Sequence, residues 1–375
     1  MSNTSQSSSL RQDSSAHEGE GNARYSWPAT LRVPHGPRLV YLDLNHWIAL
    51  AKALSGHPNG RKHHDILDQL LHAVEQGRAV FPLSLPIYVE VLKIGDHRRR
   101  SDLRKIMERL GGFAVVTSRD VIATHEIEAL LNDLVGPNPN PINVVDYLDW
   151  GVFRALGMRG GFKVVTRQGE DVTSAVRHRF SSGPDEFDRI LDEAMLNLNR
   201  EILDGPLPQD EPDFRARGYR PDLILESYVQ DAAAEHEWAR LLDTEPQWRR
   251  SRLRDAVSAR EVAFHIKEIV KTAANARSLV AFADIFRGVE DPRRAFDAMP
   301  SFDVSVTLKT TIHRIAQHRW TNNHVHDIYA LASTLPYCDV VLTDREMAAL
   351  VRRSKLDQRL GTTVLHSLQN LTGLL

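Results

Sequence analysis

The stretch RLVYLD at residues 38–43 decides how the chain starts to fold, because a compact apolar run there ends in a carboxylate. Proline and glycine bound the run upstream, so it predicts a short buried strand with Asp43 at its carboxyl end. We expect a helix over residues 45–54 directly after it. A second helix is predicted over residues 63–76, where apolar residues recur at helical spacing up to Gly77.

Strands and helices continue to alternate beyond this point. Apolar runs at 79–84 and 113–117 predict two further strands, and Pro86 stands at the first position of the helix between them. The same pattern returns at the end of the chain, with helices expected over 307–319, 327–335 and 345–351 and strands over 339–343 and 362–366. Such alternation is typical of a parallel sheet with helical crossovers, so we expect an α/β fold.

Four segments are expected along the 375 residues. Residues 1–36 are Ser-rich and polar at their start and predict a disordered tail, because they cannot bury enough apolar surface to order. The two α/β parts span 37–131 and 305–375. Between them, residues 132–304 read as polar helices with breaks at prolines and glycines, which predicts a mainly helical insertion whose role the sequence does not reveal.

Composition excludes several classes of protein. Apolar residues make up 42% and charged residues 26%, which is ordinary globular usage and excludes a wholly disordered or collagen-like chain. The formal net charge of −2 excludes nucleic-acid binding through bulk positive charge, although not through a local basic groove. A single cysteine, Cys338, and the lack of a long apolar run favour a cytoplasmic protein without a membrane segment.

Four acidic residues occupy comparable positions in the two α/β parts. Asp43 and Asp344 each follow a predicted strand, and Glu90 and Asp327 lie early in helices that follow turns. In an open α/β sheet, the carboxyl ends of the strands and the amino ends of the next helices share one edge, where sites usually form. We therefore expect all four carboxylates to meet in one cleft.

Convergence of four negative charges requires compensation, because two unit charges about 4 Å apart repel by roughly 4 kcal/mol at an effective dielectric of 20. A hard divalent cation with oxygen ligands, Mg²⁺ or Mn²⁺, supplies it. Such ions polarise a phosphodiester and activate an attacking water. The four acids are thus candidate metal ligands and catalytic residues for phosphodiester hydrolysis.

Each acid also has a structural explanation. Asp43 and Asp344 precede helices and can cap them, and Glu90 can interact with the positive end of its helix dipole. Asp327 can pair with a nearby Arg or His. Taken singly, these explanations are the commoner ones for such residues, and it is the ordered set of four that favours a site.

The residues that carry this set resemble a known family. LVYLDLNHW at 39–47, PLSLPIYVEV at 82–91 and HDIYALASTLPYCDVVLTDREMAAL at 326–350 are similar to the motifs of PIN-domain nucleases, and TTVLHSLQNLTGLL at 362–375 resembles the family's final strand and helix. The resemblance covers roughly residues 37–120 and 305–375 and matches the family's acids with Asp43, Glu90, Asp327 and Asp344. It also matches Asn45, two positions after the first acid, and Thr343, directly before the last.

The resemblance implies a Rossmann-like α/β/α sandwich with a parallel central sheet and Mg²⁺- or Mn²⁺-dependent ribonuclease activity that leaves a 5′-phosphate. It implies that Asn45 and Thr343 orient ligands or water, and often a toxin or RNA-processing role. PIN domains are usually compact, so the large insertion departs from the family pattern. The insertion leaves open the substrate class and any protein partner, such as an antitoxin.

Basic residues and histidines offer further candidates. A run at Arg98, Arg99, Arg100 and Lys105 could hold a phosphate backbone, and a solvated helix face explains it equally well. His46 could reach the cleft, although a packed helix histidine is the commoner case. His324 and His326 flank the third acid, but no companion pair shows the spacing of a zinc site.

The sequence thus predicts a metal-dependent endonuclease that acts on nucleic acid, RNA before DNA. Two alternatives remain. One is a non-catalytic PIN-like module whose insertion binds a partner, and the other is a metal-dependent phosphohydrolase of small phosphoesters. The oligomeric state is not predicted.

Overall fold

The computed structural model describes residues 27–159, 163–279, 282–285 and 292–375. Most of the predicted tail, residues 1–26, lies outside this part. Residues 27–36 differ from the expectation of disorder, because they include a two-residue strand, β1 (Leu31–Arg32), which pairs in parallel with β5 (Val145–Asp146) and buries Leu31. The ordered chain therefore begins before the proline-rich boundary that was expected to start it.

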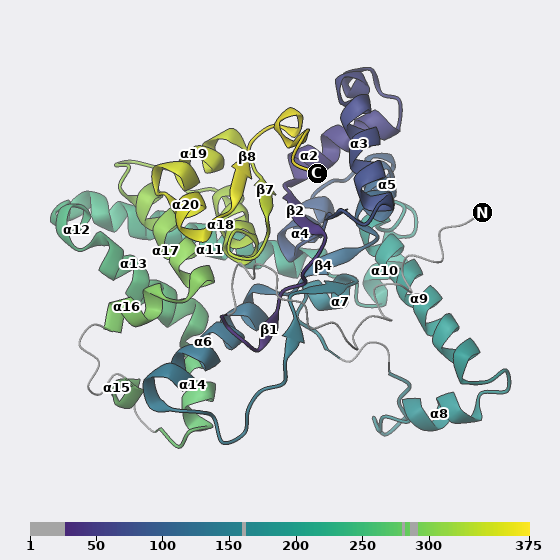
Figure 1. Cartoon of the computed structure of the whole chain (residues 1–375), viewed down its shortest axis with the longest axis horizontal. Helices are drawn as coiled ribbons and strands as arrows, with labels where there is room; N and C mark the ends of the chain where they lie inside the picture. Colours follow the sequence, from purple (N-terminus) through teal and green to yellow (C-terminus); the bar gives the residue numbers. More distant parts are fainter. Residues whose placement is uncertain (1–26, 160–162, 280–281, 286–291) are drawn as a thin grey trace.

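A parallel sheet brings the two ends of the chain together. Its strands run in the order β3 (Ala79–Val80), β2 (Arg38–Leu42), β7 (Val340–Leu342) and β8 (Thr363–Leu365). Leu42 and Leu342 are partners in the register of the two central strands. The expectation of an α/β fold with a parallel sheet is confirmed, and strands from both predicted α/β parts lie side by side in it (Figure 1).

The sheet continues beyond β3 through a short bridge. Leu83, just after β3, pairs in parallel with Val115 in β4 (Ala114–Val116). On its other side, β4 pairs antiparallel with β6 (Leu148–Trp150). Both β5 and β6 belong to the segment predicted as a helical insertion, so that segment contributes strands next to the first α/β part as well as helices.

Helices follow the strands of the first part as the apolar spacing predicted. They are α2 (Leu44–Leu54), η1 (Pro58–His63), α3 (His64–Glu75), α4 (Leu85–Leu92), α5 (His97–Ile106), η2 (Met107–Gly111) and α6 (Arg119–Val135). Gly77 has a positive φ of 66° just past the end of α3, a conformation that glycine adopts without strain. Pro86 lies in the first turn of α4, where its missing N–H leaves no intrahelical bond unmade.

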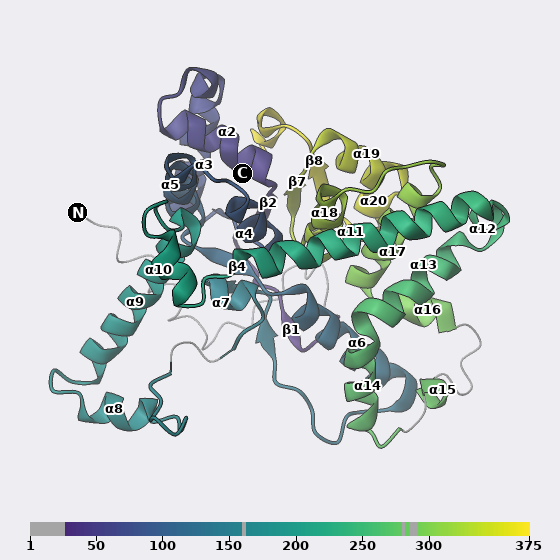
Figure 2. The ribbon, with the colours of Figure 1, turned by 180° about the vertical axis from the view of Figure 1, so that it is seen from behind.

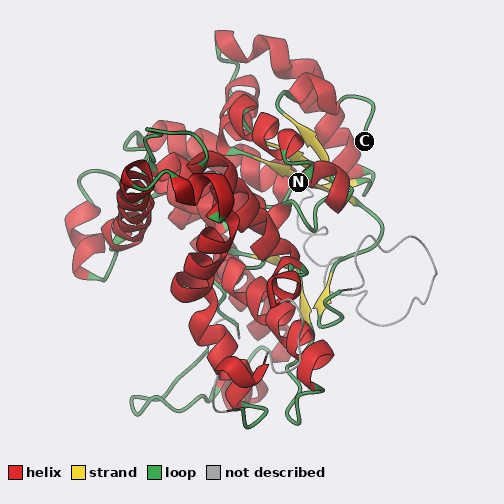
Figure 3. Cartoon of the chain, turned by 90° about the vertical axis from the view of Figure 1, so that its left-hand side faces the viewer, coloured by secondary structure: helices red, strands yellow, loops and turns green. Residues whose placement is uncertain are grey.

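Helices dominate the middle of the chain, and the molecule as a whole is mostly helical (Figure 3). They are α7 (Val152–Ala155), α8 (Thr173–Arg179), α9 (Pro184–Asp204), α10 (Glu211–Ala216), α11 (Pro221–Thr244), α12 (Gln247–Ser251), α13 (Leu253–Glu261), η3 (Val262–Ile266), α14 (Lys267–Asn275), α15 (Phe282–Ile285) and α16 (Pro292–Asp297). The longest, α11, packs against α4 and α18 and runs on to α12, as the view from behind shows (Figure 2).

The last part contains α17 (Pro300–His313), α18 (Asn322–Thr334), α19 (Arg345–Arg353), α20 (Leu356–Leu360) and the 3-10 turn η4 (Leu368–Leu371). Two of these helices begin earlier than predicted. Pro300 opens α17, and the Thr321 hydroxyl accepts a hydrogen bond from the His324 N–H to cap α18. Asp327 therefore lies in the second turn of α18 and does not open the helix.

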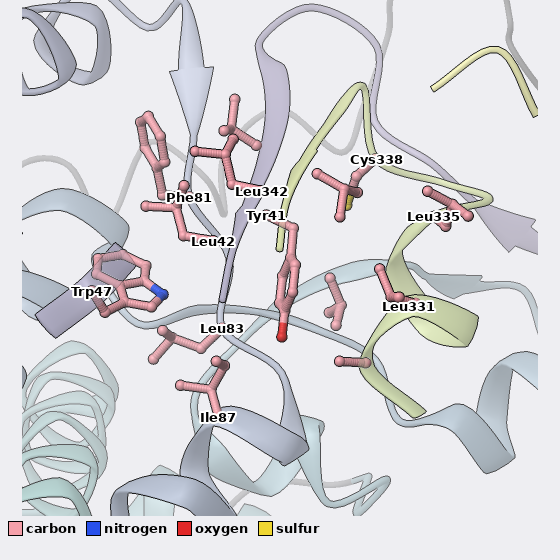
Figure 4. Close-up of a cluster of buried hydrophobic side chains, with 14 of the residues drawn as sticks. Tyr41, Leu42, Trp47, Phe81, Leu83, Ile87, Leu331, Leu335, Cys338 and Leu342 are labelled. Carbon is pink, nitrogen blue, oxygen red and sulfur yellow. The ribbon is translucent and has the colours of Figure 1, made fainter. Parts of the chain in front are cut away.

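One apolar core joins both ends of the chain. Tyr41, Trp47, Phe81 and Leu83 from the first part pack with Leu331, Leu335 and Leu342 from the last (Figure 4). A second apolar cluster forms where α6, α14 and α17 meet, and it includes Ile127, Val270 and Val306. Among the helices of the described residues, none combines the length and the apolar character needed to cross a membrane.

Candidate functional site

The first and last acids flank the two central strands at their carboxyl ends. Asp43 directly follows β2, and its backbone N–H donates to the Leu342 carbonyl of β7 at 2.9 Å. Asp344 lies two residues after Leu342. The strand that follows β2 along the chain, β3, lies on one side of this pair, and the strand that follows β7 lies on the other. The direction of strand order reverses here, which is where open α/β sheets form their binding crevice.

Both of these acids cap helices. The Asp43 carboxylate accepts from the Leu44 N–H at 2.6 Å at the start of α2, and the Asp344 carboxylate accepts from the Met347 N–H at 2.8 Å at the start of α19. A carboxylate that caps a helix can also bind another group, because it has about four acceptor sites and the cap uses one of them. Asp43 and Asp344 therefore cap helices, as one interpretation of the sequence expected, and they can still belong to the site.

Electrostatics bring the other two acids into the same cluster. Burial, together with the negative charges of Asp43, Asp344 and Glu90, raises the pKa of Asp327 to about 9, while Lys93 opposes them. All three acids must lie near Asp327 to act on it. The sequence expectation that residues from opposite ends of the chain meet at one sheet edge agrees with this placement; we call the four residues the acidic cluster.

Two further members of the acidic cluster are also difficult to ionise. Burial raises the pKa of Asp43 to about 6, with a contribution from the charge of Asp344, while the Leu44 N–H and the Asn45 side chain lower it. Burial and the charge of Asp43 raise the pKa of Glu90 to about 7, with Lys93 acting against them. Because each shift disfavours the charged form, the cluster is short of positive charge.

The donor chemistry of the acidic cluster fits a hard divalent cation, since carboxylate oxygens are the ligands that Mg²⁺ and Mn²⁺ prefer. As the side chains stand, however, no three His, Cys, Asp or Glu residues in the described ranges are gathered tightly enough to hold a metal ion. A cation would have to draw the carboxylates inward. The raised pKa values of Asp43, Glu90 and Asp327 supply the electrostatic reason for the cluster to accept a cation.

The two residues expected to orient ligands or water differ in position. Asn45 is exposed at the start of α2, and its side chain hydrogen-bonds to Asp43. Thr343 is buried between Leu342 and Asp344, and its N–H donates to the Leu365 carbonyl of β8 at 3.1 Å. Asn45 thus touches the acidic cluster directly, whereas the recorded contact of Thr343 fixes the end of β7.

Lys93, His326 and Tyr228 border the cluster, and of these only His326 was expected near it, from its place beside Asp327. The Lys93 Nζ lies 2.9 Å from the His326 Nε2, and the His326 ring stacks on Tyr228 with centroids 3.9 Å apart. Lys93 could have been found from its place three residues after Glu90, which puts both on one side of α4. Tyr228 lies in α11, and no sequence signal connects that helix to the site.

Tyr228 also lines a cavity of about 560 Å³. Tyr228, Tyr329 and the 70%-exposed Phe264 supply its aromatic wall, and none of the four acids lines it. Its floor is a buried charge network in which the Lys309 Nζ contacts Glu261 at 2.8 Å and Glu235 at 2.9 Å. A cavity of this size can hold a small organic group.

The histidines near the site are neutral and packed. Burial lowers the pKa of His46 to about 4, and its ring donates to the His366 carbonyl at the end of β8. His324 caps its own helix through Nδ1. Asp339, at the amino end of β7, accepts from the Leu39 N–H at 2.9 Å, at the opposite end of the strands from the acidic cluster.

The basic run predicted as a phosphate contact divides in the structure. Arg98, Arg99 and Lys105 are exposed on α5, and the last two form ion pairs with Asp96 and Asp102. Arg100 is buried, and its guanidinium donates to the carbonyls of Leu203 and Ile202 at the end of α9, both at 2.8 Å. That position gives Arg100 a structural contact and leaves it no surface for a ligand.

Comparisons with known proteins add no relative. No family model matches the chain, and neither a curated protein nor a solved structure matches it. Functional inference therefore rests on the geometry and electrostatics of the site.

Proposed function

We propose that this protein is a metal-dependent nuclease with a PIN-like, Rossmann-like α/β/α fold that hydrolyses phosphodiester bonds, with RNA as its main substrate. The observation that supports the proposal most strongly is the acidic cluster at the reversal point of a parallel sheet, where burial and neighbouring negative charges raise the pKa values of Asp43, Glu90 and Asp327. Perturbed carboxylates in such a place are typical of catalytic sites.

The roles of the residues follow from their chemistry. The four carboxylates would hold one or two Mg²⁺ or Mn²⁺ ions, which supply Lewis-acid polarisation of the phosphate and activation of water. Asp43 and Asp344 are the best-fixed ligands, because their helix caps hold their side chains in place. The Asn45 amide orients Asp43. Lys93 contributes a positive charge beside Glu90 and Asp327 that can face a substrate phosphate.

Asparagine variants give the sharpest test. Asn caps helices about as well as Asp, so Asp43→Asn and Asp344→Asn remove charge while retaining the cap and the fold. We expect each to lower Mn²⁺-dependent cleavage of a labelled single-stranded RNA by at least about 100-fold, the order found when a group that stabilises the transition state is removed. Glu346→Gln, two residues beyond Asp344 and exposed, is the matched control and should cleave normally.

The same assay separates the alternatives. DNA of the same sequence tests the preference for RNA, and a small phosphodiester reporter tests whether the site acts on small phosphoesters. Chelation with EDTA should abolish cleavage and added Mn²⁺ should restore it. Full activity in both Asn variants, or in EDTA, would remove the assignment. No cleavage and no Mn²⁺ binding by the wild-type chain would favour a non-catalytic binding module.

A further inference from the structure

A second cavity, of about 570 Å³, opens between α17, α19 and α20, and its lining is strongly basic. Five cationic side chains line this cavity, which we call the basic groove: Arg254, Arg314, Arg353, Lys355 and Arg359. The other lining residues are four hydroxyl side chains and one amide, and no carboxylate is among them. A local concentration of this kind is notable in a chain whose formal net charge is −2.

Only part of this positive charge is neutralised. Beneath the groove, the buried Asp303 accepts from Arg254 at 2.7 Å and from Arg359 at 2.9 Å, and Arg254 also contacts Asp297. Arg314, Arg353 and Lys355 are exposed, and none of them pairs with a carboxylate of the described residues. Three cationic side chains without a carboxylate partner therefore line the basic groove.

Helix ends explain where the three unpaired cations lie along the chain, but not why they line the same cavity. Arg314 and Arg353 lie at the carboxyl ends of α17 and α19, where positive charge interacts favourably with the helix dipole. Lys355 directly follows Ser354, the C-cap of α19, and it has the left-handed conformation, with φ of 58°, in which helices commonly end.

A buried hydroxyl is the second sign of a missing ligand. Thr310 lines the groove, is 4% exposed, and its Oγ1 has no hydrogen-bond partner in the described part of the chain. Its neighbour Thr311 bonds back to the Thr307 carbonyl at 2.8 Å, as helical threonines commonly do. Unpaired cations together with an unused hydroxyl are the groups that bind phosphate oxygens.

We infer that the basic groove binds the phosphodiester backbone of a single-stranded nucleic acid, an inference that rests on the proposed nuclease function for the identity of the strand. Helix α19 connects the groove to the acidic cluster, since Asp344 caps its first turn and Arg353 ends it. Nine helical residues at 1.5 Å each span about 13 Å.

The test uses the full chain with three groove charges removed, Arg314→Gln, Arg353→Gln and Lys355→Gln together. Binding is measured by fluorescence anisotropy with a labelled 12-nucleotide RNA, in the Asp43→Asn, Asp344→Asn background so that no cleavage occurs. We expect affinity to fall by at least about 10-fold and the plot of log affinity against log salt to become shallower by about 2, because each lost phosphate contact removes about 0.7.

A matched control removes the same charge elsewhere. Arg167, Arg179 and Arg217 are exposed near α8 and α10, on the side of the molecule opposite α19 and α20 (Figure 1). Their triple Gln variant should bind within about twofold of the parent. Lys355→Gly alone should weaken binding without lowering the thermal midpoint, because glycine relieves the left-handed strain. Unchanged affinity and salt slope in the groove variant would overturn the inference.

The length of the substrate separates this inference from the proposed function. With the active protein, the groove variant should hydrolyse a dinucleotide at the wild-type rate and show a raised KM for the 12-mer. If RNA binding depended on the groove but no RNA were cleaved, the inference about the basic groove would stand and the proposed nuclease function would be wrong. Inorganic phosphate should compete with RNA only weakly, and displacement by phosphate with the affinity of the 12-mer would overturn the assignment to a strand.

Discussion

Asp43 and Asp344 each have two roles, and their negative charge is favourable in one role and unfavourable in the other. As N-caps they interact favourably with the amino ends of α2 and α19, and as members of the acidic cluster they repel their neighbours. Asparagine separates the two effects because it retains the cap and loses the charge. We expect Asp43→Asn and Asp344→Asn to be at least as stable as the wild type in metal-free buffer.

Alanine at the same positions should behave differently. Asp43→Ala and Asp344→Ala lose the cap, so each should lower the free energy of unfolding by about 1 kcal/mol relative to its Asn counterpart. Urea denaturation of the four variants measures the difference. Equal stability of Asn and Ala at either position would show that the cap contributes nothing there.

Glu126 gives a pH dependence that is independent of the acidic cluster. It is fully buried, and it accepts from the Ser301 N–H at 3.0 Å and from the hydroxyls of Ser301 and Tyr337. Burial raises its pKa to about 7, and these hydrogen bonds only partly offset the shift. The carboxyl thus fixes the start of α17 to α6 while favouring its protonated form.

The sign of the effect follows from that pKa. An unfolded Glu titrates near about 4.3, so the folded state holds this proton more tightly. Its stabilising contribution is complete below about pH 4.3 and is lost as the pH rises through about 7. Glu126→Gln cannot titrate, so the free energy of unfolding of the wild type relative to this variant should fall between pH 5 and pH 8. The exposed Glu237→Gln should run parallel to the wild type, and a parallel profile for Glu126→Gln would contradict the prediction.

At the scale of elements, the acidic cluster combines residues from both ends of the chain. Its members come from the ends of β2 and β7 and from the helices α4 and α18. A cation bound by them should therefore stabilise the whole domain, by about 2.7 kcal/mol at 100 times its Kd. We expect Mn²⁺ to raise the thermal midpoint of the wild type and of Glu346→Gln.

The Asp43→Asn, Asp344→Asn double variant provides the contrast. It lacks two of the four ligands, so its thermal midpoint should not change with Mn²⁺ over the same range. An equal Mn²⁺ shift in the double variant would place the ion elsewhere on the protein. Calcium and magnesium in parallel series would report how strongly the site prefers one cation.

Local sequence signals predicted most of these elements, and their failures have physical causes. The apolar runs and Pro86 predicted β2, β7 and α4 because each depends on its own residues. The start of α18 was missed because its first turn is polar and its cap, Thr321, is followed three residues later by His324 and not by the usual Glu or Gln. Strand β6 was missed because its pairing with β4 is a long-range contact.

The same distinction applies to the site. The four acids could be identified because each follows a recognisable strand or lies in a helix after a turn. Glu90, however, is the sixth of the eight residues of α4 and does not lie at the start of the helix, as was expected. Tyr228 and the basic groove could not, because they depend on how α11, α17 and α20 pack. Arg100 was misleading for the same reason, as only the packing of α9 on α5 shows that its charge is buried.

At the scale of the whole molecule, the sheet makes the two ends of the chain interdependent. Strand β2 is central, and its residues Val40 and Leu42 are fully buried between β3 and β7. Residues 27–299 alone would lack β7, β8 and the helices around them, leaving β2 as an exposed apolar edge. Such edges pair with other chains and aggregate.

We therefore expect the fragment 27–299 to be insoluble or to unfold without a cooperative transition. Coexpression with residues 300–375 should restore a soluble complex, because the missing strands then complete the sheet. Circular dichroism melting and size-exclusion chromatography measure both outcomes. A cooperative melt of the 27–299 fragment alone would show that the first part folds independently. In that case the helices between the two α/β parts would stabilise the first part even without β7. The acidic cluster would then form only when residues 300–375 bind to the folded fragment.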